Sequence, residues 1–186
     1  MNLLSIELRA DLYERADCGL AWLNYVRAEA IDLTATYPFI GILAVTRVKL
    51  FPGRRFDFDD DGIPAAVCQV ISDDAETVVD LVAWPLHQPS KFATALGEAD
   101  GLGTDQVRNP ASYFAGQHLT VHRTPLRWLK AGCRGTVILN FATAPRWLGA
   151  ALGSIAGEDL GHARELARLL HPYIEPSRVL APLDAE

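Results

Sequence analysis

Acidic residues are missing from a long central stretch of this chain. From Gln106 to Gly157, 52 consecutive residues contain no aspartate or glutamate, although the 186-residue sequence holds 23 of them. This stretch, the acid-free segment, contains six of the 17 lysines and arginines, so its charge is +6 and that of the remainder is −12. A segment without acids favours contact with phosphates or with an acidic protein surface. Its cations are Arg108, Arg123, Arg127, Lys130, Arg134 and Arg146.

Cysteines and long apolar runs are also scarce. The three cysteines are widely spaced and form no Cys-x-x-Cys pair, which argues against a disulfide framework and a structural zinc site. We expect Cys18, Cys68 and Cys133 to be buried thiols. The longest uncharged apolar runs, 33–46 and 147–157, fall short of the ~20 residues of a membrane span, so no membrane partner is expected.

The composition and the first residues also bear on the source and location. Cations are mostly arginine, 14 against 3 lysines, and alanine is abundant, which is typical of a GC-rich bacterial genome or of a phage or mobile element within one. The chain begins without a basic leader ahead of its apolar residues and has an acid at Glu7. This pattern predicts a cytoplasmic protein.

Hydrophobic periodicity predicts a single α+β domain over residues 1–186. Apolar residues at helical spacing indicate a helix near 18–34, and β-branched alternation begins at Ile40. Four short strands with short links then predict an antiparallel meander packed against helices from both ends of the chain. The strands are expected at 40–50, 56–59, 65–71 and 77–84. The expected parts are a helical part over 1–37, a sheet-containing core over 38–142 and C-terminal helices over 143–186.

A strand, a short helix and a strand are expected over residues 118–142. Leu119 and Val121 alternate with polar residues, and Thr124-Pro125 provides a helix cap followed by a proline at the first helical position. The connection between the two strands is close to the minimum for a parallel crossover, which leaves room for a small βαβ element.

The short helix is the centre of the predicted binding surface. Its cations and their neighbours are spaced four, three and four apart, so helical geometry extending past both ends would align them in one stripe. Such a stripe can contact phosphates, with Trp128 stacking on a base if exposed and His122 nearby. Alternatively, the stripe is a solvated face or pairs with the protein's own acids. The stripe is Arg123, Arg127, Lys130 and Arg134.

Two aspartates form a second candidate site. In Asp57-Phe58-Asp59, strand alternation would point both carboxylates to one side, roughly 6 to 7 Å apart, a separation that can hold Mg²⁺ or Mn²⁺. The alternative is a solvated, aspartate-rich turn that ends a strand. No other cofactor is expected. Asp80 shares its predicted strand face with apolar residues and is a further candidate functional carboxylate. The alternative is that Asp80 pairs with a nearby arginine or lies on a solvated edge.

The order of these motifs resembles the archaeo-eukaryotic primase-polymerase pattern. Phe56-Asp57-Phe58-Asp59 matches the acid-x-acid motif, and Thr120-Val121-His122 matches the motif that ends in histidine. The third motif requires an acid after an apolar strand, where this chain has Asn140. The resemblance implies metal-dependent nucleotidyl transfer, and the departure removes one metal ligand.

We therefore expect a non-catalytic binding or accessory module that contacts nucleic acid or an acidic partner through its basic segment. One alternative is a metal-dependent nucleotidyl-transfer or phosphodiester enzyme that uses Asp57, Asp59 and His122. Another is an interaction or inhibitor protein that uses its acidic half. The sequence predicts no oligomeric state.

Overall fold

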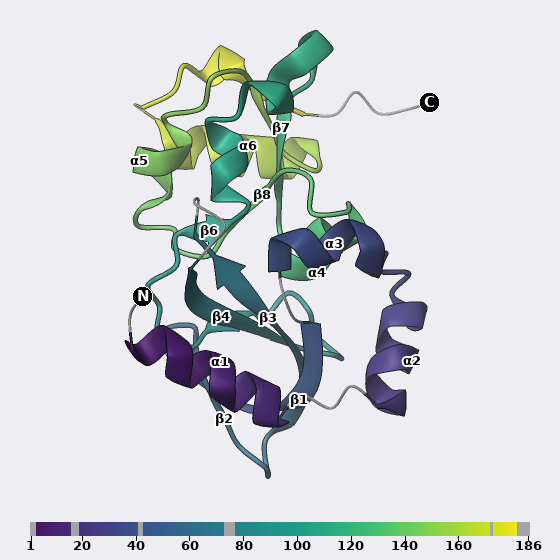
Figure 1. Ribbon diagram of the computed structural model, residues 1–186. Helices are drawn as coiled ribbons and strands as arrows, with labels where there is room; N and C mark the ends of the chain where they lie inside the picture. The colour runs from purple at the N-terminus through teal and green to yellow at the C-terminus, as the bar shows by residue number, and fades with distance from the viewer. Residues whose placement is uncertain (1–2, 16–18, 41–42, 73–76, 172, 182–186) are drawn as a thin grey trace. The chain divides into compact units, whose positions relative to one another are not determined.

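The computed structural model describes residues 3–15, 19–40, 43–72, 77–171 and 173–181. The chain forms two compact units that are not consecutive in sequence (Figure 1). Unit 1 comprises residues 1–99 and 124–133, and unit 2 comprises residues 100–123 and 134–186. That the whole chain forms one domain stays a prediction. No helix within the described ranges is long and apolar enough to cross a membrane.

Three helices begin unit 1, and the region 18–34, expected to form one helix, is divided between the second and the third. The break arises because Ala30 has a left-handed backbone, with φ of 53°. In addition, Asp32 Oδ1 accepts hydrogen bonds from the backbone N–H groups of Thr34 and Ala35, as a capping aspartate does. The helices are α1 (Leu3–Arg15), α2 (Leu20–Ala28) and α3 (Leu33–Ile40).

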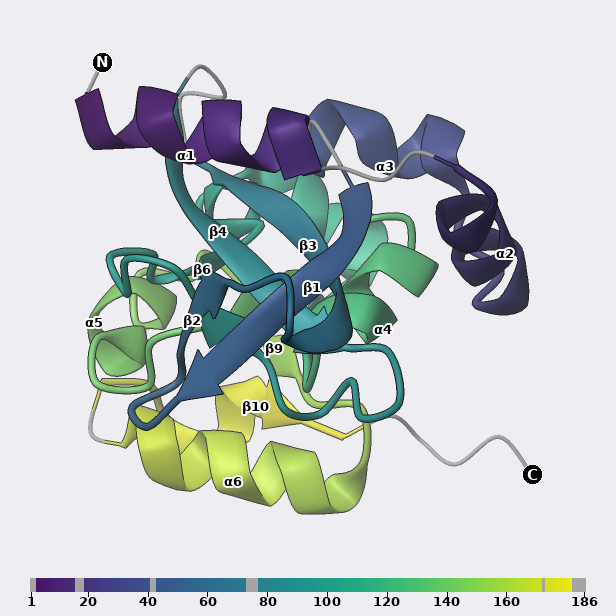
Figure 2. The same cartoon turned by 90° about the horizontal axis from the view of Figure 1, so that it is seen from below.

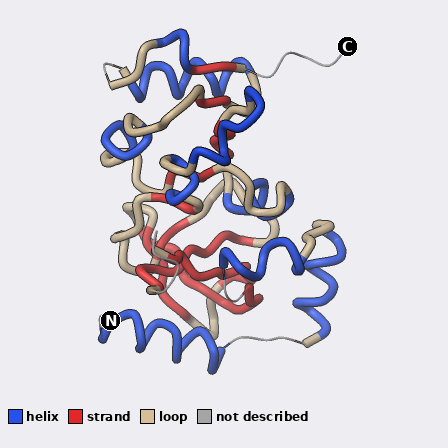
Figure 3. Tube along the Cα trace, turned by 45° about the horizontal axis from the view of Figure 1, so that its top comes forward, coloured by secondary structure: helices blue, strands red, loops and turns tan. Residues whose placement is uncertain are grey.

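Five strands of unit 1 close into a barrel, drawn in red in Figure 3. The four expected strands are present near their expected positions, and the fifth, β5, has no counterpart in the sequence-based expectation. The strands are β1 (Leu43–Phe51), β2 (Arg55–Phe58), β3 (Ile63–Ile71), β4 (Val78–Pro85) and β5 (Ala93–Thr94).

The pairing of these strands differs from the expected meander. Strand β3 pairs antiparallel with β1 rather than with β2, because the nine-residue β1 offers a longer partner than the four-residue β2. Strand β5 closes the barrel through an antiparallel pairing with β4 and a parallel pairing with β2. The mixed helix-and-strand class is confirmed, and the arrangement is a closed barrel.

Small side chains in its interior allow a barrel of only five strands to close. The buried cluster of the barrel combines alanines with a few larger residues, including Phe56 and Leu81. Helix α1 lies beside β4 (Figure 2) and contributes Leu12, which is fully buried in the same cluster. Cys68 and Cys133 are buried free thiols of unit 1, as expected, and Cys18 lies outside the described residues.

Asp80 is a fully buried carboxylate whose charge is solvated by backbone amides. Oδ1 accepts hydrogen bonds from the N–H groups of Leu81 and Leu96, both at 2.8 Å. Oδ2 accepts from Glu98 at 2.9 Å and Ala99 at 3.3 Å. Four donors from β4 and from the segment after β5 thus surround one anion, which ties that segment to the barrel. We interpret Asp80 as a structural residue.

Unit 2 contains a second sheet that the sequence-based expectation lacks. Strands β7 and β8, β7 and β9, and β9 and β10 pair in parallel, and β6 pairs antiparallel with β8. The strands, in the order β10-β9-β7-β8-β6, are β6 (Gly101–Leu102), β7 (Leu119–His122), β8 (Thr136–Ile138), β9 (Ile155–Ala156) and β10 (Val179–Leu180).

The C-terminal helices belong to unit 2 and not to the barrel's unit. Helices α5 (Ala144–Leu148) and α6 (Leu160–Leu170) bury Leu148, Leu166 and Leu170 against the apolar side chains of β7, β8 and β9. Short 3₁₀ turns complete the unit: η1 (Thr104–Val107), η2 (Pro110–Gly116) and η3 (Pro176–Arg178).

The strand-helix-strand segment expected at 118–142 is present. Strands β7 and β8 are parallel, and α4 (Pro125–Lys130) lies between them in sequence. Thr124 caps α4, since its side chain accepts a hydrogen bond from the N–H of Arg127. The helix nevertheless belongs to unit 1, so the crossover between two strands of unit 2 runs through the other unit.

We predict that Asp80→Asn lowers the free energy of unfolding by about 3 kcal/mol, because the new amide NH₂ would face N–H donors that lose their acceptor. Denaturant-induced unfolding followed by circular dichroism measures this. The exposed Asp61→Asn, which also removes one negative charge, is the control and should change stability by less than ~0.5 kcal/mol. An Asp80→Asn variant as stable as the Asp61→Asn control would contradict a stabilising role for the four hydrogen bonds that the Asp80 carboxylate accepts from backbone amides.

Candidate functional site

The predicted cationic stripe is divided between the two units. Arg127 and Lys130 lie on α4 in unit 1, whereas Arg123 and Arg134 belong to unit 2. The helix covers only six residues, and after it Gly132 and Cys133 have left-handed φ of 65° and 58°. Helical geometry therefore does not extend past both ends of α4 to align the four cations. The binding roles of these residues stay predictions.

Lys130 and Arg123 of the acid-free segment pair with acids outside it. Lys130 Nζ lies 3.4 Å from Glu29 Oε2 in unit 1. In unit 2, Arg123 Nη1 lies 2.7 Å from Glu165 Oε2, and Nη2 lies 3.3 Å from Asp159 Oδ1. The alternative that the stripe pairs with the protein's own acids therefore holds for Arg123 and Lys130. Arg127 and Arg134 are exposed.

Trp128 is not available for stacking in this conformation. Its side chain is 1% exposed. Leu126 and Leu129 of the same helix are buried as well. The three apolar side chains cover most of a two-turn helix, so only Arg127 and Lys130 of α4 are exposed.

The strand order of unit 2 reverses at β7. From β7 the chain adds β8 on one side and then β9 and β10 on the other, and all four strands are parallel. In open sheets of parallel strands, ligands bind beyond the carboxyl ends of the two strands where the order reverses. Here those ends are His122, the last residue of β7, with Arg123 after it, and Gly157-Glu158-Asp159 after β9. We call this group, with His162 and Glu165 of α6, the switch-point cluster.

His122 is held by both ring nitrogens. Nδ1 lies 3.1 Å from Glu158 Oε1, and Nε2 lies 2.9 Å from the backbone oxygen of Arg134. The side chains of His122 and Glu158 are only 11% and 9% exposed. Gly135, with φ of 83°, permits this approach, because a Cβ there would collide with the Thr120 carbonyl and touch Nε2. Both ring nitrogens thus have oxygen partners in unit 2, and the binding role of His122 stays a prediction.

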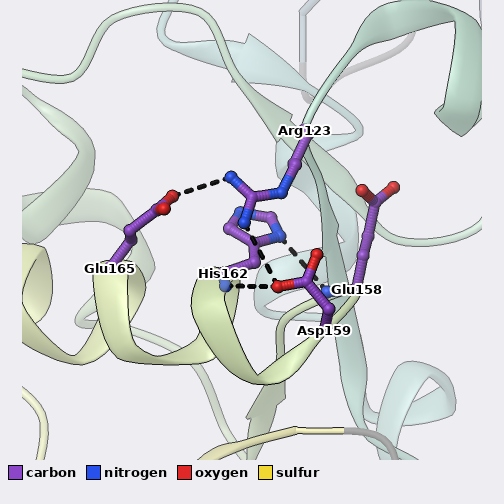
Figure 4. Close-up of polar contacts among 5 residues, drawn as sticks. All are labelled: Arg123, Glu158, Asp159, His162 and Glu165. Carbon is purple, nitrogen blue, oxygen red and sulfur yellow. Dashed lines mark hydrogen bonds and ion pairs between the residues drawn. The ribbon is translucent and has the colours of Figure 1, made fainter.

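Arg123 lies over the first turn of α6 (Figure 4), between Glu165 and Asp159. Asp159 is also the N-cap of this helix, and its Oδ1 accepts the backbone N–H of His162 at 2.7 Å. These hydrogen bonds, from the His162 backbone first and from Arg123 second, lower the pKa of Asp159. Hydrogen bonds to Glu165 and, with smaller effect, to Asp159 raise the pKa of Arg123. The charge of Arg123 is thus compensated within the cluster.

His162 is a buried neutral histidine at the start of α6. Its side-chain Nδ1 accepts the backbone N–H of Glu158 at 3.2 Å, so the ring proton lies on Nε2. Burial lowers the pKa of His162 because it disfavours the charged ring, and the nearby positive charge of Arg123 lowers it further. Glu158, Glu165 and Asp159 act in the opposite direction with smaller effect.

Asp57 and Asp59 each accept a local backbone hydrogen bond. Asp57, exposed on β2, accepts the N–H of Phe58 at 2.8 Å. Asp59 follows the end of β2, and its side chain accepts the N–H of Asp61 at 2.9 Å. Within the described residues no group of three or more His, Cys, Asp or Glu side chains is placed to hold a metal ion. A metal role for the pair stays a prediction.

The sequence-based expectation includes His122 and Arg123 but misses their partners. Glu158, Asp159 and Glu165 lie 36 to 42 positions away, and only the parallel pairing of β7 with β9 brings the two segments together. The one local signal is Asp159 three residues before His162, a spacing typical of a helix N-cap. No family model, curated protein or solved structure matches this chain.

We predict that acid destabilises unit 2 through His162. Because the folded pKa of His162 lies below the ordinary value of 6.5, the unfolded chain binds the proton first as the pH falls below 6.5. The neutral ring of His162 therefore makes its full contribution to the free energy of unfolding above pH 6.5. This contribution falls as the pH drops from 6.5 towards the lower folded pKa, by at most about 1.4 kcal/mol per pH unit.

The measurement compares unfolding free energies at pH 7.5 and 5.5 in the parent and in His162→Gln. Glutamine keeps an oxygen acceptor for the N–H of Glu158 but does not titrate, so the parent should lose more stability than the variant. His171→Gln, which changes an exposed histidine beyond the end of the same helix, is the control and should behave as the parent. Equal losses in the parent and His162→Gln would refute the assignment.

Proposed function

We propose that this protein is a non-catalytic nucleic-acid-binding module that uses the exposed arginines of its acid-free segment. The supporting observation concerns Arg108, Arg134 and Arg146 of unit 2, all of which are exposed. Among the described residues, no carboxylate lies within 4.0 Å of their guanidinium groups. Their charge is therefore available to phosphate groups, which guanidinium can bind through two hydrogen bonds.

These arginines come from segments that contact one another. Arg108 follows η1, and Arg134 precedes β8 by two residues. The side-chain oxygen of Gln106 in η1 accepts the N–H of Gly135 at 2.8 Å, which joins the two segments. Helix α5, which carries Arg146, packs against η1. A shared region of unit 2 thus presents three cations, an arrangement suited to a polyanion.

Exposed aromatic rings favour nucleic acid over an acidic protein as the partner. Phe114 and Phe141 lie in the same acid-free segment of unit 2 and are 77% and 48% exposed. Rings next to cations can stack on bases, whereas the carboxylates of an acidic protein need only the charge. In the switch-point cluster, His122, Arg123 and His162 form hydrogen bonds or ion pairs with other groups of unit 2. This arrangement supports a non-catalytic role.

We predict binding that weakens with salt and depends on these arginines. Fluorescence polarisation with labelled DNA and RNA should show a logarithmic salt slope that falls by about 2 in Arg108→Glu, Arg134→Glu, since each phosphate contact contributes about 1. The control, Arg164→Glu, Arg168→Glu on the exposed face of α6, makes the same charge change outside the acid-free segment. Equal weakening in both variants would attribute the effect to net charge, and preference for polyglutamate over nucleic acid would favour an acidic protein partner.

The enzymatic alternative makes a separate prediction about Asp57 and Asp59. If this pair holds a metal for phosphoryl transfer, calorimetric titration with Mn²⁺ should show binding that Asp57→Asn, Asp59→Asn abolishes. The non-catalytic proposal expects identical titrations for the parent and this variant. Loss of Mn²⁺ binding in the variant would therefore overturn the non-catalytic proposal.

A further inference from the structure

The hairpin formed by β1 and β2 in unit 1 presents an exposed aromatic ring among cations. No acid occurs from Leu33 to Phe56, a second acid-free stretch that lies outside the segment 106–157. Phe51 ends β1 and is 43% exposed. The cations of the hairpin, all exposed, are Arg47, Lys49, Arg54 and Arg55.

Alternation along β1 places the ring and two cations on one side. Arg47, Lys49 and Phe51 are exposed, whereas Val48 between them is fully buried. Across the hairpin, Phe51 lies opposite Arg55 in the strand register, and Lys49 lies opposite Asp57. The ring of Phe51 therefore has a cation two residues before it on its own strand and another on the neighbouring strand.

Neutral groups contact Arg47, Lys49 and Arg55 of the hairpin. Arg47 Nη1 donates a hydrogen bond to the backbone oxygen of Gly62 at 2.6 Å, and Arg55 Nη1 donates to the backbone oxygen of Leu96. Lys49 Nζ lies 5.8 Å from the centroid of the Phe51 ring. Carbonyl oxygens and aromatic rings orient a cation but carry no compensating unit charge. This hairpin thus differs from Arg123, which two carboxylates hold.

The turn of the hairpin holds an arginine in a strained conformation. Gly53 and Arg54 have φ of 80° and 60°, in the left-handed region that glycine and asparagine adopt at least cost. The strained residue places its guanidinium carbon 4.4 Å from the centroid of the buried Phe92 ring. Backbone strain of this kind gathers at binding loops, where the side chain is required in one position. The fixed guanidinium extends the cationic surface to the tip of the hairpin.

We infer that the β1–β2 hairpin binds single-stranded nucleic acid, with Phe51 stacking on a base and Lys49, Arg54 and Arg55 contacting the flanking phosphates. This inference rests on the proposed function and names the form of nucleic acid and a second contact surface. A single strand offers unpaired base faces next to its phosphates, and an exposed ring between cations matches that alternation. The bases of a duplex are already stacked on one another, so a duplex gains only the phosphate contacts.

The test uses a fluorescently labelled oligothymidine of about 20 nucleotides and a duplex of equal length. Phe51→Leu removes the aromatic face at an exposed position and should weaken binding to the single strand at least fivefold, the lower end of what one stacked base contributes. Phe51→Trp keeps an aromatic ring and should retain the affinity of the parent. Phe39→Leu is the matched control, since Phe39 is an equally exposed phenylalanine of unit 1 outside the hairpin, at 42%.

Arg54→Asn tests the charge at the tip without adding strain. Asparagine tolerates the left-handed conformation, so the variant should melt at or near the temperature of the parent while its salt slope falls by about 1. The duplex should bind more weakly than the single strand and should respond to Arg54→Asn but not to Phe51→Leu.

The outcomes separate this inference from the proposed function. If Phe51→Leu binds oligothymidine within twofold of the parent while Arg108→Glu, Arg134→Glu loses binding, the hairpin inference is wrong and the proposed function stands. If only the hairpin variants lose binding, the inference stands and the surface assigned to the arginines of unit 2 is wrong. A parent protein that binds neither probe at low salt overturns both.

Discussion

The parallel pairing of β7 with β8 on one side and β9 on the other is the constraint on which the arrangement of unit 2 depends. It buries Leu119 and Val121 in the core of the unit. It also places the residues that follow β7 next to those that follow β9, so that Arg123 reaches Asp159 and Glu165. Without this register the cap of α6, the buried His162 and the arginine above them would not form one cluster.

The cations of this protein differ in the groups that they contact. Arg123 and Lys130 are bound by carboxylates of their own units, so their charge is largely compensated. In the hairpin, Arg47 contacts a carbonyl oxygen and Lys49 lies near an aromatic ring, and neither group carries a compensating unit charge. A count of lysines and arginines in the sequence cannot distinguish these cases, because the difference lies in the acceptor that each side chain meets.

Local features of the fold could be predicted from the sequence, and long-range features could not. The strand positions followed from alternation, and the cap at Thr124 followed from Thr-Pro, because each depends on neighbouring residues. The pairing of β3 with β1 and the second sheet depend on contacts between distant segments, which periodicity does not specify. Asp80 illustrates the limit: its position on a strand was predictable, but its four amide donors come in part from residues 16 to 19 positions later.

The position of α4, which belongs to unit 1 but lies between two segments of unit 2 in the sequence, affects the synthesis of the protein and its division into fragments. Unit 2 consists of residues 100–123 and 134–186, and residues 124–133 between these segments belong to unit 1. During synthesis unit 1 therefore lacks Leu126, Trp128 and Leu129 until the first segment of unit 2, residues 100–123, has already been made. No single cut in the backbone yields both units whole, so neither can be expressed alone as one uninterrupted natural fragment without carrying part of the other.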